Sequence, residues 1–371
     1  MLKNKACPRR CVRVQYGKEV DVTVEAFAPP AGRSVWFGKD LAKTKDWIFL
    51  LPRDTVDEID HCLARLRPSG KRLEDIGTSD FPFSTIAAQI EAFKQEIATG
   101  RGFVIVRGLP SDRYSDDELG KIFWGFAAHF GVAMRQSFLG DRLATVMDLT
   151  DEEPEPRLRR GYHSAGAQLV HTDACGDIVG MVSIRAAKEG GASRLASAHA
   201  VHNIMLDLCP ELLRVLYEGF FCRMPDSDAE AMGIPALIPR RVPAYELEND
   251  WLNCNYRRGN LMRAVAAGDH QLTPRELAAI DVFASLGNHA DVMIEMLLEP
   301  GDFQMLNNRT VLHGRAHFED YPEKARRRHL KRLWLSVDEW PKIPSVQGSR
   351  YSDNIWKWQG SARQRAAVAD A

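Results

Sequence analysis

The sequence has no long hydrophobic run, and none of its apolar stretches reaches the roughly 20 residues that a membrane-spanning helix needs. Residues 1–10 are basic, but they lack the apolar core of roughly 7–15 residues that marks a secretory signal peptide. We therefore expect a cytoplasmic protein that has no membrane partner.

An excess of charge of either sign is also missing. The 49 lysines and arginines almost balance the 50 aspartates and glutamates, and the formal net charge is −1. Such a chain has no global attraction to nucleic acid or to an anionic membrane, so we expect neither as a partner. The contents of hydrophobic residues (45%) and charged residues (27%) are typical of a soluble globular protein.

The seven cysteines show no dense spacing. An odd and scattered set argues against a disulfide framework and predicts reduced thiols. Cys7 and Cys11 could form half of a metal site, but no second pair follows with the spacing of a zinc site. We therefore interpret this segment as an N-terminal tail.

The residues that carry most information are His171, Asp173 and His313. Two neutral imidazoles and one carboxylate are the 2-His-1-carboxylate set that holds non-haem Fe(II) by one face. Alternation along a strand would point His171 and Asp173 the same way, and His313 must come from a distant strand. With 11 histidines and 50 acidic residues in the chain, an isolated HxD triplet arises easily by chance. Whether these residues form a metal site therefore has to be judged from the segments around them.

The hydrophobic pattern predicts many short strands with helices between them. We expect strands at 102–108, 177–185, 292–298, 303–306 and 329–336. Helices are expected at 54–66, 84–99 and 199–217. Two further helices should begin after a capping box that starts at Ser115 and after Thr273, where Pro274 stands in the first turn. This pattern indicates a mainly β protein with outer helices, in the form of a double-sheet jelly roll. Alternation in the final strand places Arg328, Arg332 and Trp334 on one face.

Five segments together resemble the taurine dioxygenase-like family of Fe(II)/2-oxoglutarate oxygenases. They are GRGFVIVRGLP at 100–110, HTD at 171–173, AAKEGGAS at 186–193, GDFQMLNNRTVLHGR at 301–315 and RRHLKRLWL at 327–335. The resemblance implies a double-stranded β-helix core of the clavaminate synthase-like type. It places one dioxygenase domain at 31–340, with a helical insertion at about 199–290 and with extensions at 1–30 and 341–371.

The same resemblance assigns the metal ligands and the co-reactants. It implies that His171, Asp173 and His313 hold Fe(II), and that 2-oxoglutarate and O2 bind at the open positions. His317 could compete as a ligand, but the match of NNRTVLHG favours His313. Halogenating relatives vacate the carboxylate position for chloride, so Asp173 favours oxygen transfer or hydrogen abstraction without halide.

The far carboxylate of 2-oxoglutarate needs a buried cation, and the planar fork of an arginine matches it with two charge-assisted hydrogen bonds. The resemblance gives this role to Arg328, with Ser193 where the family commonly has threonine. The gap after His313 is a few residues longer than in taurine-specific members, so Arg327 or Arg332 could be the partner instead. Arg332 could also meet an acidic group of the substrate, or form an exterior salt bridge.

Substrate contacts are expected from two polar segments, each of which could equally be ordinary surface. The first contains Tyr162 and Ser164, and the second contains Asn255 and Arg257. Taurine is not the expected substrate, because we find no N-terminal histidine region of the kind that helps to hold a sulfonate in taurine-specific members. We expect a small polar molecule that bears an acid group, and we leave homo-oligomerisation open.

The expected reaction is hydroxylation of an unactivated C–H bond, while 2-oxoglutarate is converted to succinate and CO2. Desaturation, epimerisation or ring closure after the same hydrogen abstraction would use the same residues. Two alternatives belong to other classes, namely a binding protein whose triad holds a structural metal and a zinc hydrolase. Neither would need Arg328 and Ser193, so both are disfavoured.

Overall fold

The computed structural model describes residues 29–136, 140–151, 161–248 and 250–341. The extensions predicted for 1–30 and 341–371 lie almost entirely outside these ranges, as do Cys7 and Cys11. Five cysteines are described, and no disulfide joins any two of them, namely Cys62, Cys175, Cys209, Cys222 and Cys254. No helix in the described part of the chain is long and apolar enough to cross a membrane.

The core of the molecule consists of two β-sheets. The larger sheet has seven strands in the order β1 (Ile48–Leu50), β2 (Phe103–Arg107), β14 (Phe303–Asn307), β6 (Ile178–Arg185), β17 (His329–Ser336) and β3 (Val132–Ala133), with β4 (Leu143–Val146) also paired to β17. Of these pairs, only β1 with β2 is parallel. The predicted final strand is confirmed, and its central pairing with β6 buries most of its side chains.

The smaller sheet has four antiparallel strands, in the order β13 (Met293–Met296), β8 (Ser193–Ser197), β15 (Val311–Arg315) and β5 (Gln168–His171). One hydrophobic cluster joins the two sheets, since it contains Val179 and Leu306 of the larger sheet and Leu195 and Val311 of the smaller one. The expected double-sheet jelly roll is therefore present.

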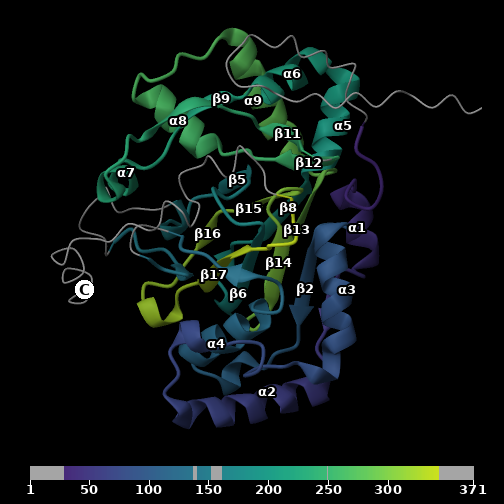
Figure 1. Cartoon of the computed structure of the whole chain (residues 1–371), viewed down its shortest axis with the longest axis vertical. Coiled ribbons are helices and arrows are strands. Elements are labelled where there is room, and N and C mark those ends of the chain that lie inside the picture. Colours follow the sequence, from purple (N-terminus) through teal and green to yellow (C-terminus); the bar gives the residue numbers. More distant parts are fainter. Residues whose placement is uncertain (1–28, 137–139, 152–160, 249, 342–371) are drawn as a thin grey trace, which may run out of the picture.

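Helices cover both outer faces of this sandwich (Figure 1). Against the larger sheet pack α2 (Arg53–Leu66), α3 (Ala87–Ala98) and α4 (Asp116–Ala127), which share a cluster of buried side chains with β2, β6 and β14. The capping box predicted at the start of α4 is confirmed: Ser115 accepts a hydrogen bond from the Glu118 N–H, and the Glu118 carboxylate accepts one from the Ser115 N–H.

The segment between β8 and β13 covers the smaller sheet. It contains α5 (Ala198–Leu208), α6 (Pro210–Glu218), β9 (Phe220–Arg223), α7 (Asp226–Met232), β10 (Leu237–Val242), β11 (Tyr245–Glu248), β12 (Trp251–Cys254), α8 (Arg258–Ala266) and α9 (Pro274–Gly287). The prediction of one helix over 199–217 is wrong. Pro210 has no N–H and disfavours a helical conformation of Cys209, so the chain ends α5 there and starts α6. The helix start predicted after Thr273, with Pro274 in the first turn, is confirmed, and the structure adds a capping box between Thr273 and Glu276.

Candidate metal centre

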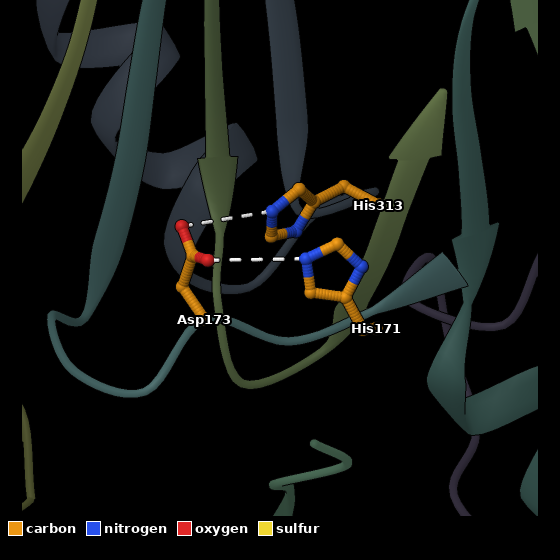
Figure 2. Close-up of side chains that lie close together, drawn as sticks. All are labelled: His171, Asp173 and His313. Carbon is orange, nitrogen blue, oxygen red and sulfur yellow. Dashed lines mark ion pairs between the residues drawn. The ribbon is translucent and has the colours of Figure 1, made fainter. Parts of the chain in front are cut away.

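His171, Asp173 and His313 meet between the two sheets (Figure 2). Strands β5 and β15 pair in a register that sets His313 opposite His171, and the two ring centroids lie 4.6 Å apart. The His171 Nε2 is 3.9 Å from the Asp173 Oδ1, and the His313 Nε2 is 3.7 Å from the Asp173 Oδ2. The three ligand atoms lie within 4.8 Å of one another, so one ion could contact them all.

Asp173 is placed by a loop and not by strand alternation, which differs from the expectation. Strand β5 ends at His171, and the next residues are held by Asn308. The Asn308 Oδ1 accepts a hydrogen bond of 2.8 Å from the Asp173 N–H, and its Nδ2 donates to the backbone oxygens of Asp173, Cys175 and Gly176. Asn308 precedes β15, so one short segment supplies both His313 and the support for Asp173.

The carboxylate of Asp173 has further partners on β17. The Trp334 Nε1 donates to its Oδ2 at 2.6 Å, and the Arg332 Nη1 lies 3.3 Å from the same oxygen. Burial raises the pKa of Asp173, but Arg332 and the two histidines outweigh burial and hold that pKa well below its usual range. Asp173 therefore stays ionised, as a metal ligand must.

The two imidazoles also suit a metal. The His171 Nδ1 lies 2.9 Å from the Leu169 carbonyl oxygen, and this hydrogen bond leaves Nε2 as the basic nitrogen that faces Asp173. Burial, followed by the charge of His313, lowers the pKa of His171 to about 4, so the ring is neutral near pH 7. The donor set fits Fe(II) bound on one face. His317, the competing candidate, is exposed and lies outside this group.

A cationic pocket adjoins the metal centre. The guanidinium groups of Arg315 and Arg328 lie over the buried ring of Phe318, with their Cζ atoms 4.6 and 5.2 Å from its centroid. Both arginines are buried, and the Arg328 Nη1 has no hydrogen-bond partner in the described part of the chain. Burial, followed by the charge of Arg315, lowers the pKa of Arg328 to about 9, while Asp320 acts against this shift.

Two glycines of the AAKEGGAS segment allow this packing. Gly190 belongs to β7 (Glu189–Gly190), which pairs with β16 (Phe318–Glu319). Gly191 has φ +75°, and a Cβ at this position would lie 3.1 Å from the Arg328 Nε. The segment then enters β8 at Ser193, whose hydroxyl donates to the Gln304 Oε1 at 2.9 Å, and both side chains line the pocket with Arg328.

The other candidate arginines have different surroundings. Arg327 pairs with Asp151 at 2.6 Å, which directs it away from the pocket. Arg332 is buried and not part of an exterior salt bridge, and its guanidinium Cζ lies 4.6 Å from the ring centroid of Tyr162 and 5.0 Å from that of Trp334. Its Nε also donates to the Gln136 Oε1 at 2.8 Å, so Arg332 is fixed beside Asp173.

A larger cavity of about 540 Å³ opens onto the metal group, and its lining includes His171, Asp173 and Arg332. Two of the four predicted substrate residues, Tyr162 and Arg257, also line it. The other two do not. The Ser164 hydroxyl turns back to the Gly161 carbonyl oxygen, and Asn255 is buried in the link between β12 and α8, where its N–H donates to the Ala244 carbonyl oxygen.

Several residues that support the site were not assigned a role from the sequence, namely Arg315, Trp334, Asn308, Gln304 and Gln136. Strand alternation, which placed Arg328 and Arg332 on one face, could also have identified two of these residues. Arg315 lies two residues after His313 in β15, and Trp334 lies two residues after Arg332 in β17. The roles of Asn308 and Gln136 depend on contacts between distant segments, which leave no local signal.

Comparisons with known proteins agree with this geometry. A family model described as "Taurine catabolism dioxygenase TauD, TfdA family" matches residues 65–334. The FR-33289 synthase of Streptomyces rubellomurinus is 27% identical over 339 residues, which cover 90% of this chain and 97% of that protein. The taurine hydroxylase-like protein SAT17 of Stachybotrys chartarum is 27% identical over 317 residues, or 82% of this chain and 79% of that protein.

The fold is shared with solved oxygenase structures. An asparagine oxygenase in complex with Fe(II), 3-hydroxyasparagine and succinate superposes with a TM-score of 0.60 at 14% identity, covering 78% of this chain and 93% of that chain. At this low identity the likeness concerns the fold, and it supports the jelly-roll assignment of the two sheets.

Proposed function

The chain belongs to the TauD/TfdA family and is an Fe(II)- and 2-oxoglutarate-dependent dioxygenase, and from this premise we propose that it hydroxylates a C–H bond of a small polar metabolite. The observation that carries the proposal is the juxtaposition of two sites. A 2-His-1-carboxylate group lies beside a buried cationic pocket, and His171 of this group lines both that pocket and the large cavity. When bound, iron with 2-oxoglutarate and O2 supplies the oxidation, and succinate and CO2 are released.

We assign the metal ligands to the Nε2 atoms of His171 and His313 and to a carboxylate oxygen of Asp173. Three protein ligands leave open positions for the keto acid end of 2-oxoglutarate and for O2. The hydrogen bond from Trp334 and the contact with Arg332 hold the Asp173 carboxylate in one orientation. These outer contacts act as positioning interactions for the ligand.

We assign the far carboxylate of 2-oxoglutarate to Arg328. Its buried guanidinium has an unpartnered Nη1 within the described residues, and the Ser193 hydroxyl lies on the same pocket. Arg315 adds a second positive charge without occupying the Arg328 fork, because its own Nη2 donates to the Ser164 carbonyl oxygen at 2.6 Å. A dianionic co-substrate would neutralise this buried excess of charge.

The experiment that tests the proposal has two stages. Titration of the Fe(II)-loaded protein with 2-oxoglutarate under anaerobic conditions should produce a visible charge-transfer band. A metabolite screen scored by succinate release, with mass spectrometry of the product, then identifies the substrate and separates hydroxylation from desaturation or ring closure. His171→Ala and Asp173→Ala should each abolish substrate-coupled succinate formation, and retained turnover in both variants would overturn the assignment.

A further inference from the structure

Arg257 is a buried arginine that forms no salt bridge with any carboxylate in the described part of the chain. It is 8% exposed and lines the large cavity, yet its Nε, Nη1 and Nη2 have no hydrogen-bond partner among the described residues. By contrast, Arg309, Arg327 and Arg332 each contact a carboxylate. A guanidinium carries five N–H donors, and leaving it buried and unpaired is costly. Such a group is retained where a ligand completes it.

The first turn of α8 adds more donors at the same place. Arg257 is the N-cap residue of this helix and makes no side-chain cap hydrogen bond, and Arg258, Gly259 and Asn260 all line the cavity. The Asn260 N–H already donates to the Arg257 carbonyl oxygen at 3.0 Å, whereas the N–H groups of Arg258 and Gly259 precede this first bond and carry the partial positive charge of a helix N-terminus. The Asn260 Nδ2 is likewise without a partner in the described part of the chain, while its Oδ1 accepts from the Arg263 Nη1.

The space in front of this turn is open. A Cβ placed on Gly259 would meet no atom within 4 Å, and its φ lies outside the left-handed range, so side chains are sterically allowed there. The two carboxylates of the cavity lining are already engaged. Asp173 contacts Arg332 and Trp334, and Asp228 has interactions of its own. Neither carboxylate forms a salt bridge with Arg257 among the described residues.

We propose that Arg257, the Asn260 amide and the first turn of α8 form an oxyanion subsite that holds the acidic group of the substrate, either a carboxylate or a phosphoryl group. The inference rests on the proposed function, because the same cavity is lined by His171 and Asp173. An acid group held at α8 would tether the substrate so that its reacting carbon lies toward the metal ligands. Arg257 is then the specificity-determining residue of the cavity.

The test measures the binding of simple anions to the full chain. The protein is first loaded with Fe(II) and saturated with 2-oxoglutarate without O2, so that the Arg328 pocket is filled and the charge-transfer band reports it. Inorganic phosphate and acetate are then titrated by calorimetry. Hydrogen bonds to charged groups contribute roughly 1.5–3 kcal/mol, so Arg257→Gln should weaken binding by about tenfold to a hundredfold.

The matched control is Arg53→Gln, which removes an exposed arginine from the first residue of α2. This variant should bind both probes like the parent protein. Tighter binding of phosphate assigns a phosphoryl substrate, and tighter binding of acetate assigns a carboxylate. If the parent protein binds neither probe, or if Arg257→Gln binds both unchanged, the subsite does not exist. Absence of the charge-transfer band would instead contradict the proposed function.

A second pair of variants leaves Arg257 in place, so that the test does not depend on whether the Arg257→Gln variant folds. Gly259→Asp places a carboxylate in the open space at the start of α8 and should abolish binding of both probes by occupying the subsite. Gly259→Asn has nearly the same shape without the charge and should retain binding. Equal probe affinity in the two variants would overturn the inference.

Discussion

Arg315 and Arg328 place two positive charges around the buried ring of Phe318, and this arrangement determines what a substitution there should do. Each guanidinium is buried, and burial lowers the pKa of Arg315 to about 10 and contributes most to the lowered pKa of Arg328. The two buried positive charges therefore destabilise the protein when the pocket is empty, and a bound anion offsets this cost. A substitution that removes one of the charges should weaken anion binding and stabilise the empty protein.

The first prediction concerns Arg328→Gln. Removing one partner of a buried charged pair costs about 3–5 kcal/mol, and each 1.4 kcal/mol corresponds to about tenfold in affinity. We expect 2-oxoglutarate to bind a hundredfold or more weakly, with Fe(II) affinity nearly unchanged, in an anaerobic titration. Arg326→Gln, a change of an exposed neighbour, is the control. If 2-oxoglutarate affinity falls a hundredfold in Arg332→Gln and is unchanged in Arg328→Gln, Arg332 is the residue that binds the far carboxylate.

Trp334 allows a test of how the carboxylate ligand is oriented. Trp334→Phe keeps an aromatic ring but removes the N–H that donates to Asp173. Loss of such an outer contact typically reduces metal affinity by about 10–100-fold, which a competition assay with a chelator would measure. Trp36→Phe removes a comparable hydrogen bond, to the Arg101 carbonyl oxygen, and Trp36 lines neither of the two pockets beside the metal ligands. The assignment is wrong if both variants hold Fe(II) equally well.

At the scale of elements, the turn between β7 and β8 fixes the position of Arg328. Gly191→Ala should cost about 1 kcal/mol of stability through its positive φ and should also weaken 2-oxoglutarate binding, because the new methyl group approaches the Arg328 Nε. Gly70→Ala is a matched control, with φ +66° and no atom near the new Cβ. Urea unfolding and co-substrate titration of both variants separate the two effects, and weakened binding in both would refute the steric explanation.

Elements with a strong local signal could be predicted, and contacts between elements could not. The alternation of 329–336 predicted β17, the Ser115 capping box predicted the start of α4, and Thr273 followed by Pro274 predicted the start of α9. The break at Pro210 was missed because the apolar pattern continues across it. The register that sets His313 against His171 depends on strand pairing over a long separation. The assigned roles of the metal and co-substrate residues remain predictions.

For the whole molecule, buried histidines should make stability depend on pH. Burial lowers the pKa of His202 and of His329 to about 4, from the usual value of 6.5 for a histidine. Both rings are neutral in the folded protein and take up protons on unfolding, so their stabilising contribution is complete above about pH 6.5 and is lost as the pH falls toward 4. Proton linkage predicts that each of these histidines lowers the free energy of unfolding by on the order of 2 kcal/mol at pH 5 relative to pH 8.

Urea unfolding at pH 8 and pH 5 would measure this loss. His202→Gln should reduce the difference between the two pH values, whereas His61→Gln, a change of an exposed residue of α2, should leave it unchanged. The same pH dependence in both variants would exclude His202 as a source of the loss.

The pairing of β5 with β15 has a consequence for the order of folding. The two strands are separated in the chain by the whole segment that covers the smaller sheet. Contacts between such distant segments form late, and a chain made from its N-terminus presents β5 long before β15. During synthesis, His171 and Asp173 are therefore without their third partner. If these three residues hold the iron, high-affinity metallation has to wait until β15 has been made and paired with β5, so iron uptake would report that the sandwich has closed.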